Sequence, residues 1–186
     1  MASEPAGDCE FEAIIYDLDG TLVRLTVDWD AVRDEVAVFF EQRGHSVEGK
    51  TLWTFLDYAD ETGYRDVVEE IIGEHERAGA RRSDRLATAD ELDERTGPVG
   101  VCSLNCEAAC RIALEVHELL GYVDTIVGRD SVATRKPDPE PLLTVAQRLA
   151  VDPEAILFVG DSERDEIAAE RAGMAFRYVG DGPSGH

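Results

Sequence analysis

The chain has 186 residues, 44% of them hydrophobic, which is enough to bury a sizeable core as one domain or as a core with a small insertion. Its 40 acidic residues outnumber its 18 basic residues, for a formal net charge of −22. This excess argues against nucleic acid as a default partner, because phosphate backbones would be repelled. Since no apolar run approaches the roughly 18 residues of a membrane helix, we also expect no membrane partner.

The basic residues are almost all arginines, since Lys50 and Lys136 are the two lysines. Scarce lysine together with a large acidic excess is typical of halophilic proteins, whose surface carboxylates hold water while salt screens their repulsion. An ordinary acidic protein is the alternative. The segment MASEPAGDCE at the start lacks the basic and apolar regions of a secretory signal, so we expect a cytoplasmic protein.

The first predicted element is a buried strand in the stretch AIIYDLDGTLV, residues 13–23. Asp17 follows the apolar run directly and Asp19 comes two residues later, so both carboxylates can reach one pocket near the strand end. Gly20 permits a sharp departure of the chain after them. Taken alone, this pattern also fits an ordinary strand that enters a turn.

Residues 24–85 break the pattern of strands, because helical sequences follow one another at 28–44, 50–63 and 64–79. A helical insertion directly after a strand that carries two carboxylates is typical of a lid over the strand ends. We therefore predict a helical cap at residues 25–85.

Beyond the insertion, short apolar runs alternate with helical patterns. The runs are 99–104, 125–128, 155–161 and 175–180, and the helical patterns are 107–121, 139–150 and 163–173. Apolar strands that are each followed by a helix indicate a parallel sheet covered on both faces. We predict an α/β fold: a three-layer Rossmann-like parallel sheet core, residues 11–24 and 86–180, with a small all-helical cap inserted after the first strand.

The four cysteines are Cys9, Cys102, Cys106 and Cys110, and the last three are spaced by four residues. Thiolates one helical turn apart could hold a metal or cluster. We favour burial in the core, because Cys102 lies in an apolar strand and the next two fall on the inner stripe of the following helix. The spacing does not indicate a disulfide framework.

Side chains that could bind a ligand or take part in catalysis follow the later predicted strands, at the edge where ligands bind in parallel sheets. Ser103 ends one strand, Lys136 lies in the proline-stiffened loop RKPDPEP, and GDSERD places Asp161 at a strand end with Asp165 four residues later. Converging carboxylates repel each other, and oxygen ligands without His or Cys suit Mg²⁺. A divalent ion, a lysine and a hydroxyl form a phosphoryl receptor, and a remaining carboxylate can attack phosphorus.

Together these residues resemble the haloacid dehalogenase-like hydrolase superfamily in its phosphatase branch, and its phosphoglycolate phosphatase-like members in particular. DLDGTL matches the first motif, Ser103 the second, Lys136 the third and GDSERD the fourth. The insertion resembles the small helical cap that many members carry between the first two motifs. The second motif reads SLN, so a contact of Asn105 with phosphate stays open.

The resemblance implies that Asp17 is the nucleophile that forms an aspartyl-phosphate, and that Asp19 is the general acid and then the base. It implies Mg²⁺ as cofactor, held by the Asp17 carboxylate, the Asp19 backbone carbonyl and Asp161. Asp165 would support the metal or orient Lys136. The residues thus assigned are Asp17, Asp19, Ser103 and Lys136 for catalysis, and Asp17, Asp19, Asp161 and Asp165 for the metal.

Other members of the superfamily fit the sequence less well. A dehalogenase needs no second carboxylate after the nucleophile, so Asp19 favours phosphoryl chemistry. A phosphonatase needs a cap lysine, for which Lys50 is the candidate, but the first motif has the phosphatase form. A phosphosugar mutase, and a binding or regulatory module that kept the fold without turnover, remain as alternatives.

The expected substrate is a small phosphorylated metabolite such as phosphoglycolate, hydrolysed by a monomer or weak homodimer. Its recognition is expected in the cap. The candidate residues are Arg24, Arg33, Arg65, Trp29, Trp53 and Tyr58. The alternative is that the cap aromatics form a small core of the cap itself.

Overall fold

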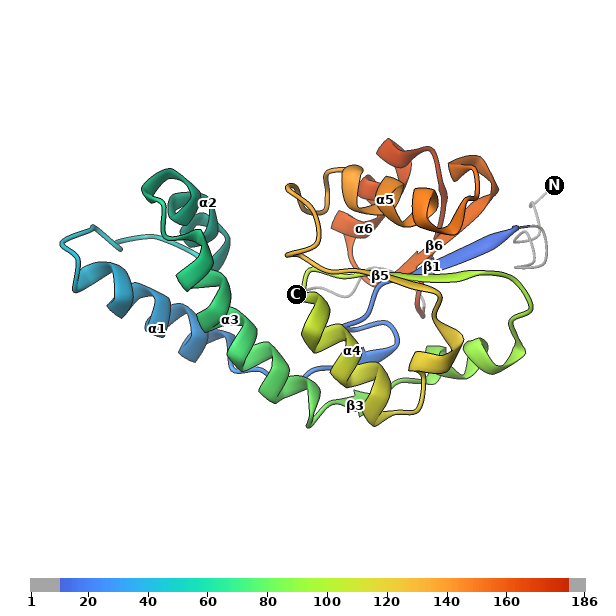
Figure 1. The fold of residues 1–186 in the computed structure, drawn as a ribbon, viewed down its shortest axis with the longest axis horizontal. Helices are drawn as coiled ribbons and strands as arrows, with labels where there is room; N and C mark the ends of the chain where they lie inside the picture. Colours follow the sequence, from blue (N-terminus) through green and yellow to red (C-terminus); the bar gives the residue numbers. More distant parts are fainter. Residues whose placement is uncertain (1–10, 181–186) are drawn as a thin grey trace.

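A five-stranded parallel sheet lies between helices in the larger part of the molecule, on the right in Figure 1. The computed structural model describes residues 11–180; the segment read for a secretory signal, including Cys9, lies outside them. The strand order is β5-β4-β1-β6-β7. The strands are β1 Ala13–Tyr16, β4 Val99–Cys102, β5 Thr125–Val127, β6 Ile156–Gly160 and β7 Ala175–Tyr178. The predicted α/β fold is therefore confirmed.

Helices cover both faces of the sheet and make three layers (Figure 1). α4 (Glu107–Val116) lies on one face, and α5 (Glu140–Leu149) and α6 (Glu163–Ala172) lie on the other. Ile14 and Tyr16 of β1 pack in the apolar cluster that includes α4, whereas Ile15, between them, packs in the cluster with α5 and α6. This alternation explains why the strand is apolar throughout.

Short 3₁₀ segments complete the connections. They are η2 Ala87–Glu94, η3 Leu120–Tyr122 and η4 Pro153–Ala155. The single helix predicted over 107–121 is interrupted, because α4 ends at Val116 and Glu118 adopts a left-handed conformation with φ of 58°. That backbone conformation cannot continue a right-handed helix, so η3 forms a separate turn.

Three helices extend from one end of the sheet: α1 (Trp29–Glu41), α2 (Leu52–Thr62) and α3 (Arg65–Ala80) (Figure 1). They share an apolar cluster of their own, which includes Val32, Phe40 and Phe55. We call residues 25–85, which contain them, the cap. The division into a core of 11–24 and 86–180 and a cap of 25–85 stays a prediction.

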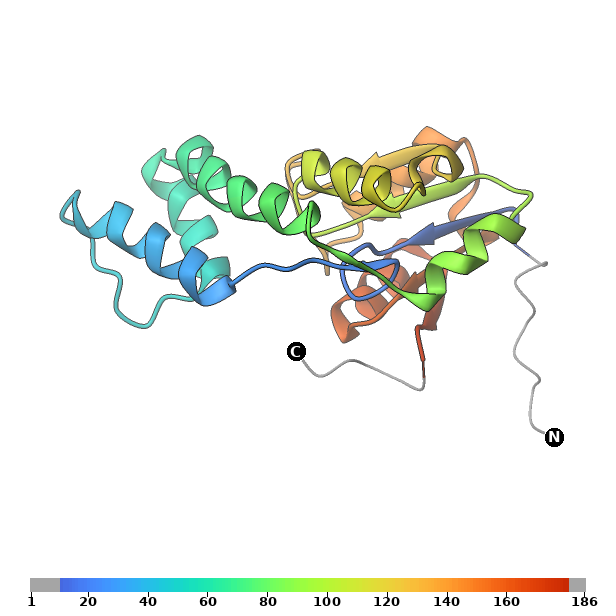
Figure 2. The same ribbon diagram turned by 90° about the horizontal axis from the view of Figure 1, so that it is seen from below.

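The cap joins the core through two neighbouring segments. β2 (Val23–Arg24) pairs antiparallel with β3 (Asp84–Arg85), so the chain leaves and re-enters the core at the same place. α3 also packs against α4, and the two helices lie close together in both views (Figure 2).

Within residues 11–180, none of the helices is both long and apolar enough to cross a membrane.

The cysteine prediction is confirmed for the three cysteines that the structure describes. Cys102, Cys106 and Cys110 are buried and carry free thiols. Burial raises the pKa of Cys102 and of Cys106 to about 12, which keeps both thiols protonated and unreactive at neutral pH.

Candidate active site

Asp17 lies at the carboxyl end of β1, between β4 and β6 in the middle of the sheet. Its backbone N–H donates to the Val159 carbonyl at 2.8 Å, which continues the strand ladder for one more residue. Its Oδ1 accepts a hydrogen bond from the Leu18 backbone N–H, also at 2.8 Å. Strand and turn together hold this buried carboxylate in one orientation at the sheet edge.

The turn after β1 brings Asp19 and Gly20 into the same region. Gly20 has a φ of 84°, and a Cβ atom at this position would collide with the carboxylate of Asp161. Glycine is therefore needed both for the backbone conformation and for the close approach of Asp161. Asp19 Oδ1 accepts a hydrogen bond of 2.8 Å from the N–H of Leu25, where the cap begins.

Lys136 reaches the strand ends from the loop that precedes α5, and its side chain is almost completely buried. Its ammonium nitrogen lies 3.1 Å from Asp17 Oδ1, 2.6 Å from Asp165 Oδ1 and 3.1 Å from the carbonyl oxygen of Cys102. Burial acts to lower the pKa of Lys136, but the Asp165 and Asp17 carboxylates outweigh this effect and leave the pKa raised. The lysine therefore stays cationic.

The fourth motif supplies two acids at the start of α6. Ser162 and Asp165 form a capping box in which Asp165 Oδ2 accepts hydrogen bonds from the Ser162 hydroxyl at 2.7 Å and from its N–H at 3.2 Å. The other oxygen of Asp165 contacts Lys136. Asp165 is thus fixed by the helix terminus, with one oxygen directed at the lysine.

Three carboxylates meet at this point. One oxygen from each of Asp17, Asp161 and Asp165 lies within 4.8 Å of the others. The pKa of Asp17 is raised to about 8: burial is the largest cause, Lys136 opposes it, and the Asp165 and Asp161 carboxylates add to it. The pKa of Asp19 is also raised, mainly by burial.

This arrangement fits a small divalent cation. Three carboxylate oxygens face one another beside a single ammonium group, so negative charge is in excess. Hard oxygen donors are the ligands that Mg²⁺ prefers. Gly20 leaves the space that Asp161 needs. The Asp19 carboxylate does not belong to the group of three among the described residues, and a metal contact through its backbone carbonyl stays a prediction.

Ser103 and Asn105 follow β4 and lie beside this cluster. The Ser103 hydroxyl donates to Asn105 Oδ1 and accepts from the Asn105 N–H, each at 3.1 Å, and both residues are buried. Asn105 is thereby tied to the serine of the second motif, although two residues separate them along the chain.

A cavity of about 1010 Å³ lies between these strand ends and the cap. Asp17, Asp19, Ser103, Asp161 and Asp165 line its core side. Of the cap residues proposed from the sequence, Trp29, Arg33 and Trp53 line the cavity.

The other three candidates from the cap lie elsewhere. Arg65 pairs with Asp60 and Glu69. Tyr58 packs on Phe40 within the cap and forms a hydrogen bond with His45. It thus belongs to the core of the cap itself, which is the alternative predicted for the cap aromatics. Arg24 lies exposed in β2.

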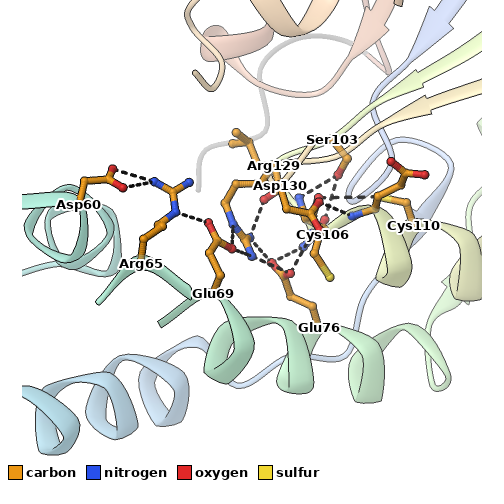
Figure 3. Close-up of polar contacts among 12 residues, drawn as sticks. Asp60, Arg65, Glu69, Glu76, Ser103, Cys106, Cys110, Arg129 and Asp130 are labelled. Atoms are coloured by element: carbon orange, nitrogen blue, oxygen red, sulfur yellow. Dashed lines mark hydrogen bonds and ion pairs between the residues drawn. The ribbon is translucent and has the colours of Figure 1, made fainter. Parts of the chain in front are cut away.

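One cluster was not anticipated from the sequence. Glu76 of α3 is fully buried and pairs with Arg129, which follows β5. Both line the cavity. Figure 3 shows the chain of contacts that continues from Arg129 to Glu69, Arg65 and Asp60.

A sequence signal for this cluster existed. The buried positions of α3 include Val68, Ile72 and Glu76, which are four residues apart. A carboxylate in register with an apolar stripe requires a buried partner. The sequence does not identify that partner, because Arg129 lies 53 residues further along the chain.

The sequence matches one protein family over most of its length. The family model described as "Haloacid dehalogenase-like hydrolase" matches residues 14–179. A phosphoglycolate phosphatase from Cereibacter sphaeroides is 42% identical over 84 residues, a match that covers 45% of this chain and 38% of the relative. The match thus spans less than half the length of that relative.

Two further matches extend over more of the chain. The pyrophosphatase PpaX of Oceanobacillus iheyensis is 27% identical over 170 residues, or 87% of this chain and 79% of the relative. The crystal structure of CbbY from Rhodobacter sphaeroides in complex with phosphate shares the fold, with a TM-score of 0.66 and 19% identity over 94% of this chain and 87% of that one. With its four motifs gathered at one sheet edge, the chain belongs to the haloacid dehalogenase-like hydrolase family.

Proposed function

We propose that the protein is a Mg²⁺-dependent phosphatase that hydrolyses a small phosphomonoester through an aspartyl-phosphate. The observation that carries the proposal is the position of the Lys136 ammonium between Asp17 and Asp165, in a cluster where three carboxylates meet. A buried cation beside an excess of buried carboxylates is suited to accept a phosphoryl group next to a nucleophile.

Asp17 is the proposed nucleophile, because it is the carboxylate whose position is fixed by both the strand ladder and the following turn. Its attack on phosphorus would form a bond from carboxylate oxygen to phosphorus and release the alcohol. Asp19 would give a proton to the departing oxygen and then take one from the water that hydrolyses the acyl-phosphate. Burial raises the pKa of both Asp19 and Asp17, so the positions of the two carboxylates, not their pKa values, assign the two roles.

Lys136 and Ser103 would bind the oxygens of the transferring group. The ammonium supplies positive charge where negative charge develops. The serine hydroxyl has a single O–H, which would turn from Asn105 Oδ1 to a phosphoryl oxygen while its oxygen stays held by the Asn105 N–H. Asp165 would orient Lys136 through their 2.6 Å contact.

The carboxylates of Asp17 and Asp161 and the backbone carbonyl of Asp19 would hold Mg²⁺, with Asp165 close to it. When bound, the ion would neutralise charge on the phosphoryl oxygens. Excess negative charge in the cluster supports this assignment.

The proposed substrate is a small phosphorylated metabolite such as phosphoglycolate, by analogy with the relatives named phosphoglycolate phosphatase. We also propose that the protein works as a monomer or weak homodimer in a salt-rich cytoplasm. The net charge of −22 supports the salt-rich setting.

The test is release of inorganic phosphate by the purified protein in high KCl with and without Mg²⁺. The panel contains phosphoglycolate, pyrophosphate and sugar phosphates. We expect turnover of at least one phosphomonoester, lost on chelation of the metal. Isomerisation of a sugar phosphate without phosphate release would instead identify a mutase. Phosphate binding without any turnover would identify a binding module.

A further inference from the structure

Glu76 is an unusual residue for the cap to bury. It is 0% exposed, yet its carboxylate makes four hydrogen bonds to residues outside the cap. Its Oε1 accepts from Arg129 Nη1 at 2.5 Å and from Asn105 Nδ2 at 3.2 Å. Its Oε2 accepts from the Cys106 N–H at 2.9 Å and from Arg129 Nη2 at 3.1 Å. The carboxylate is thus fully satisfied by core groups (Figure 3).

Arg129 completes the cluster from the core side. It is 3% exposed and donates to the Leu104 carbonyl at 2.8 Å and to Glu69 Oε2 at 2.9 Å, besides its two bonds to Glu76. The positive charge of Arg129 offsets the negative charge of Glu76, so this carboxylate can line a cavity that is proposed to bind an anion. Because desolvation offsets much of the attraction in a buried ion pair, stability alone explains such a pair poorly. The pair also fixes the orientation of the groups that surround it.

The group that Glu76 orients is the side-chain amide of Asn105. With Nδ2 donating to Glu76, the amide oxygen faces the Ser103 hydroxyl and accepts from it at 3.1 Å. The reversed amide would direct its oxygen at the Glu76 carboxylate, and two acceptors would face each other. Glu76 therefore selects one of the two amide orientations.

This orientation sets the position of the serine hydroxyl. Ser103 Oγ is held between the Asn105 amide oxygen and the Asn105 backbone N–H. It stands at the end of β4, the strand that pairs with β1 and Asp17. A continuous path of hydrogen bonds thus runs from a cap helix, through Asn105, to the proposed phosphoryl-binding serine.

We propose that Glu76 is a positioning residue of the phosphoryl site, which acts through Asn105 and makes phosphate affinity depend on how α3 is seated on the core. The inference extends the proposed function and rests on it. The ligand class is a phosphate dianion, either free or as the head of a monoester.

The experiment measures binding of inorganic phosphate to the Mg²⁺-loaded protein by calorimetry in high KCl. In Glu76→Gln an amide nitrogen at the Oε1 position faces the donors of Arg129 and Asn105, so Asn105 loses the acceptor that orients it. We expect the dissociation constant for phosphate to rise about tenfold, the effect of one buried polar group left unpaired. Glu70→Gln is the matched control, because Glu70 lies on the same helix, is largely exposed and pairs with Arg77. It should bind phosphate as wild type does.

A double-mutant cycle separates positioning from general support of the fold. If Glu76 acts through Asn105, the variant with both Glu76→Gln and Asn105→Ala binds phosphate no more weakly than Asn105→Ala alone. Additive losses would overturn the proposal, as would wild-type affinity in a folded Glu76→Gln. If Glu76→Gln does not fold, Asn105→Ala alone tests the path, because it removes the amide that joins Glu76 to Ser103. Unchanged phosphate affinity in a folded Asn105→Ala would likewise overturn the proposal.

The wild-type protein distinguishes the two levels of inference. If it neither binds phosphate nor releases it from any ester, the proposed function fails and this inference fails with it. If it binds phosphate and turns over an ester while Glu76→Gln does both equally well, only the positioning role fails.

Discussion

The Asp17 carboxylate lies 3.1 Å from the Lys136 ammonium and among two other carboxylates, so its charge matters for both chemistry and folding. We expect Asp17→Asn to abolish phosphatase turnover, because an amide does not attack phosphorus. Its Tm without divalent metal should not fall, since the amide removes a buried charge and the repulsion it causes. Phosphate-release assays and thermal melts check both points. Asp152→Asn is the control, because Asp152 is exposed and precedes β6. Wild-type turnover in Asp17→Asn would show that Asp17 is not the nucleophile.

Asp19 differs from Asp17 in its contacts, because its Oδ1 accepts from the Leu25 N–H at the start of the cap. In Asp19→Asn the amide cannot transfer the proton, so kcat should fall roughly 10²- to 10⁴-fold. Mg²⁺ affinity should change little, because the proposed ligand is the backbone carbonyl. Steady-state kinetics at saturating Mg²⁺ and a metal titration measure the two effects. A collapse of metal affinity with an almost normal rate would contradict the acid and base role.

At the scale of elements, α2 contacts the core near two site residues. The guanidinium groups of Arg164 and Arg135 lie 5.2 Å and 5.6 Å from the ring centre of Trp53, and Arg135 also pairs with Asp57. These arginines directly precede Asp165 and Lys136. Trp53 therefore links the cap to both loops while it lines the cavity.

From these contacts we expect Trp53→Ala to raise KM roughly 2- to 30-fold, the range for losing a cation–π contact, with a smaller effect on kcat. Trp53→Phe, which keeps an aromatic ring, should recover part of the loss. Val38→Ala, an exposed change on α1, serves as the control. A large fall in kcat at constant KM would show that the ring acts on the chemical step instead.

The same elements show how far the sequence could predict the fold and the candidate site. The strand at 13–17 and the acids after it are local patterns, and parallel strands bring their carboxyl ends together, so Asp17, Lys136 and Asp165 could be placed at one edge. The pairing of Glu76 with Arg129 could not be predicted from the sequence, because it joins a cap helix to a loop 53 residues away. Which cap residues line the cavity depends on how α1 and α2 pack, and periodicity does not fix that packing.

At the scale of the whole molecule, a net charge of −22 implies strong self-repulsion in the compact state. The Debye length falls from about 10 Å at 0.1 M salt to about 3 Å at 1 M, so neighbouring carboxylates cease to repel one another. We therefore expect Tm to rise steeply between about 0.1 and 2 M KCl. Thermal melts in a KCl series measure the response, and a flat curve would contradict halophilic adaptation.

Mg²⁺ should stabilise the protein separately from salt, because it binds the folded site. At about 100 times its dissociation constant the gain is about 2.7 kcal/mol, or roughly 5 to 11 °C in Tm for a domain of this size. Asp161→Ala removes one of the three carboxylates and should show a much smaller gain. Melts of both proteins at fixed KCl, with and without Mg²⁺, give the comparison. An equal gain in both would contradict the metal assignment.

The pairing of β2 with β3 has an evolutionary consequence. Val23 and Arg85 face each other in register, so the chain crosses from core to cap and back through one gap about 5 Å wide. A helical segment of any length whose ends meet at that spacing fits there without rethreading the sheet. If the cap selects the substrate, as proposed, exchange of this whole module would change the substrate without moving the acids at the strand ends. Any exchanged module must bring its own substitute for Glu76, or the core loses the contact that now orients Asn105.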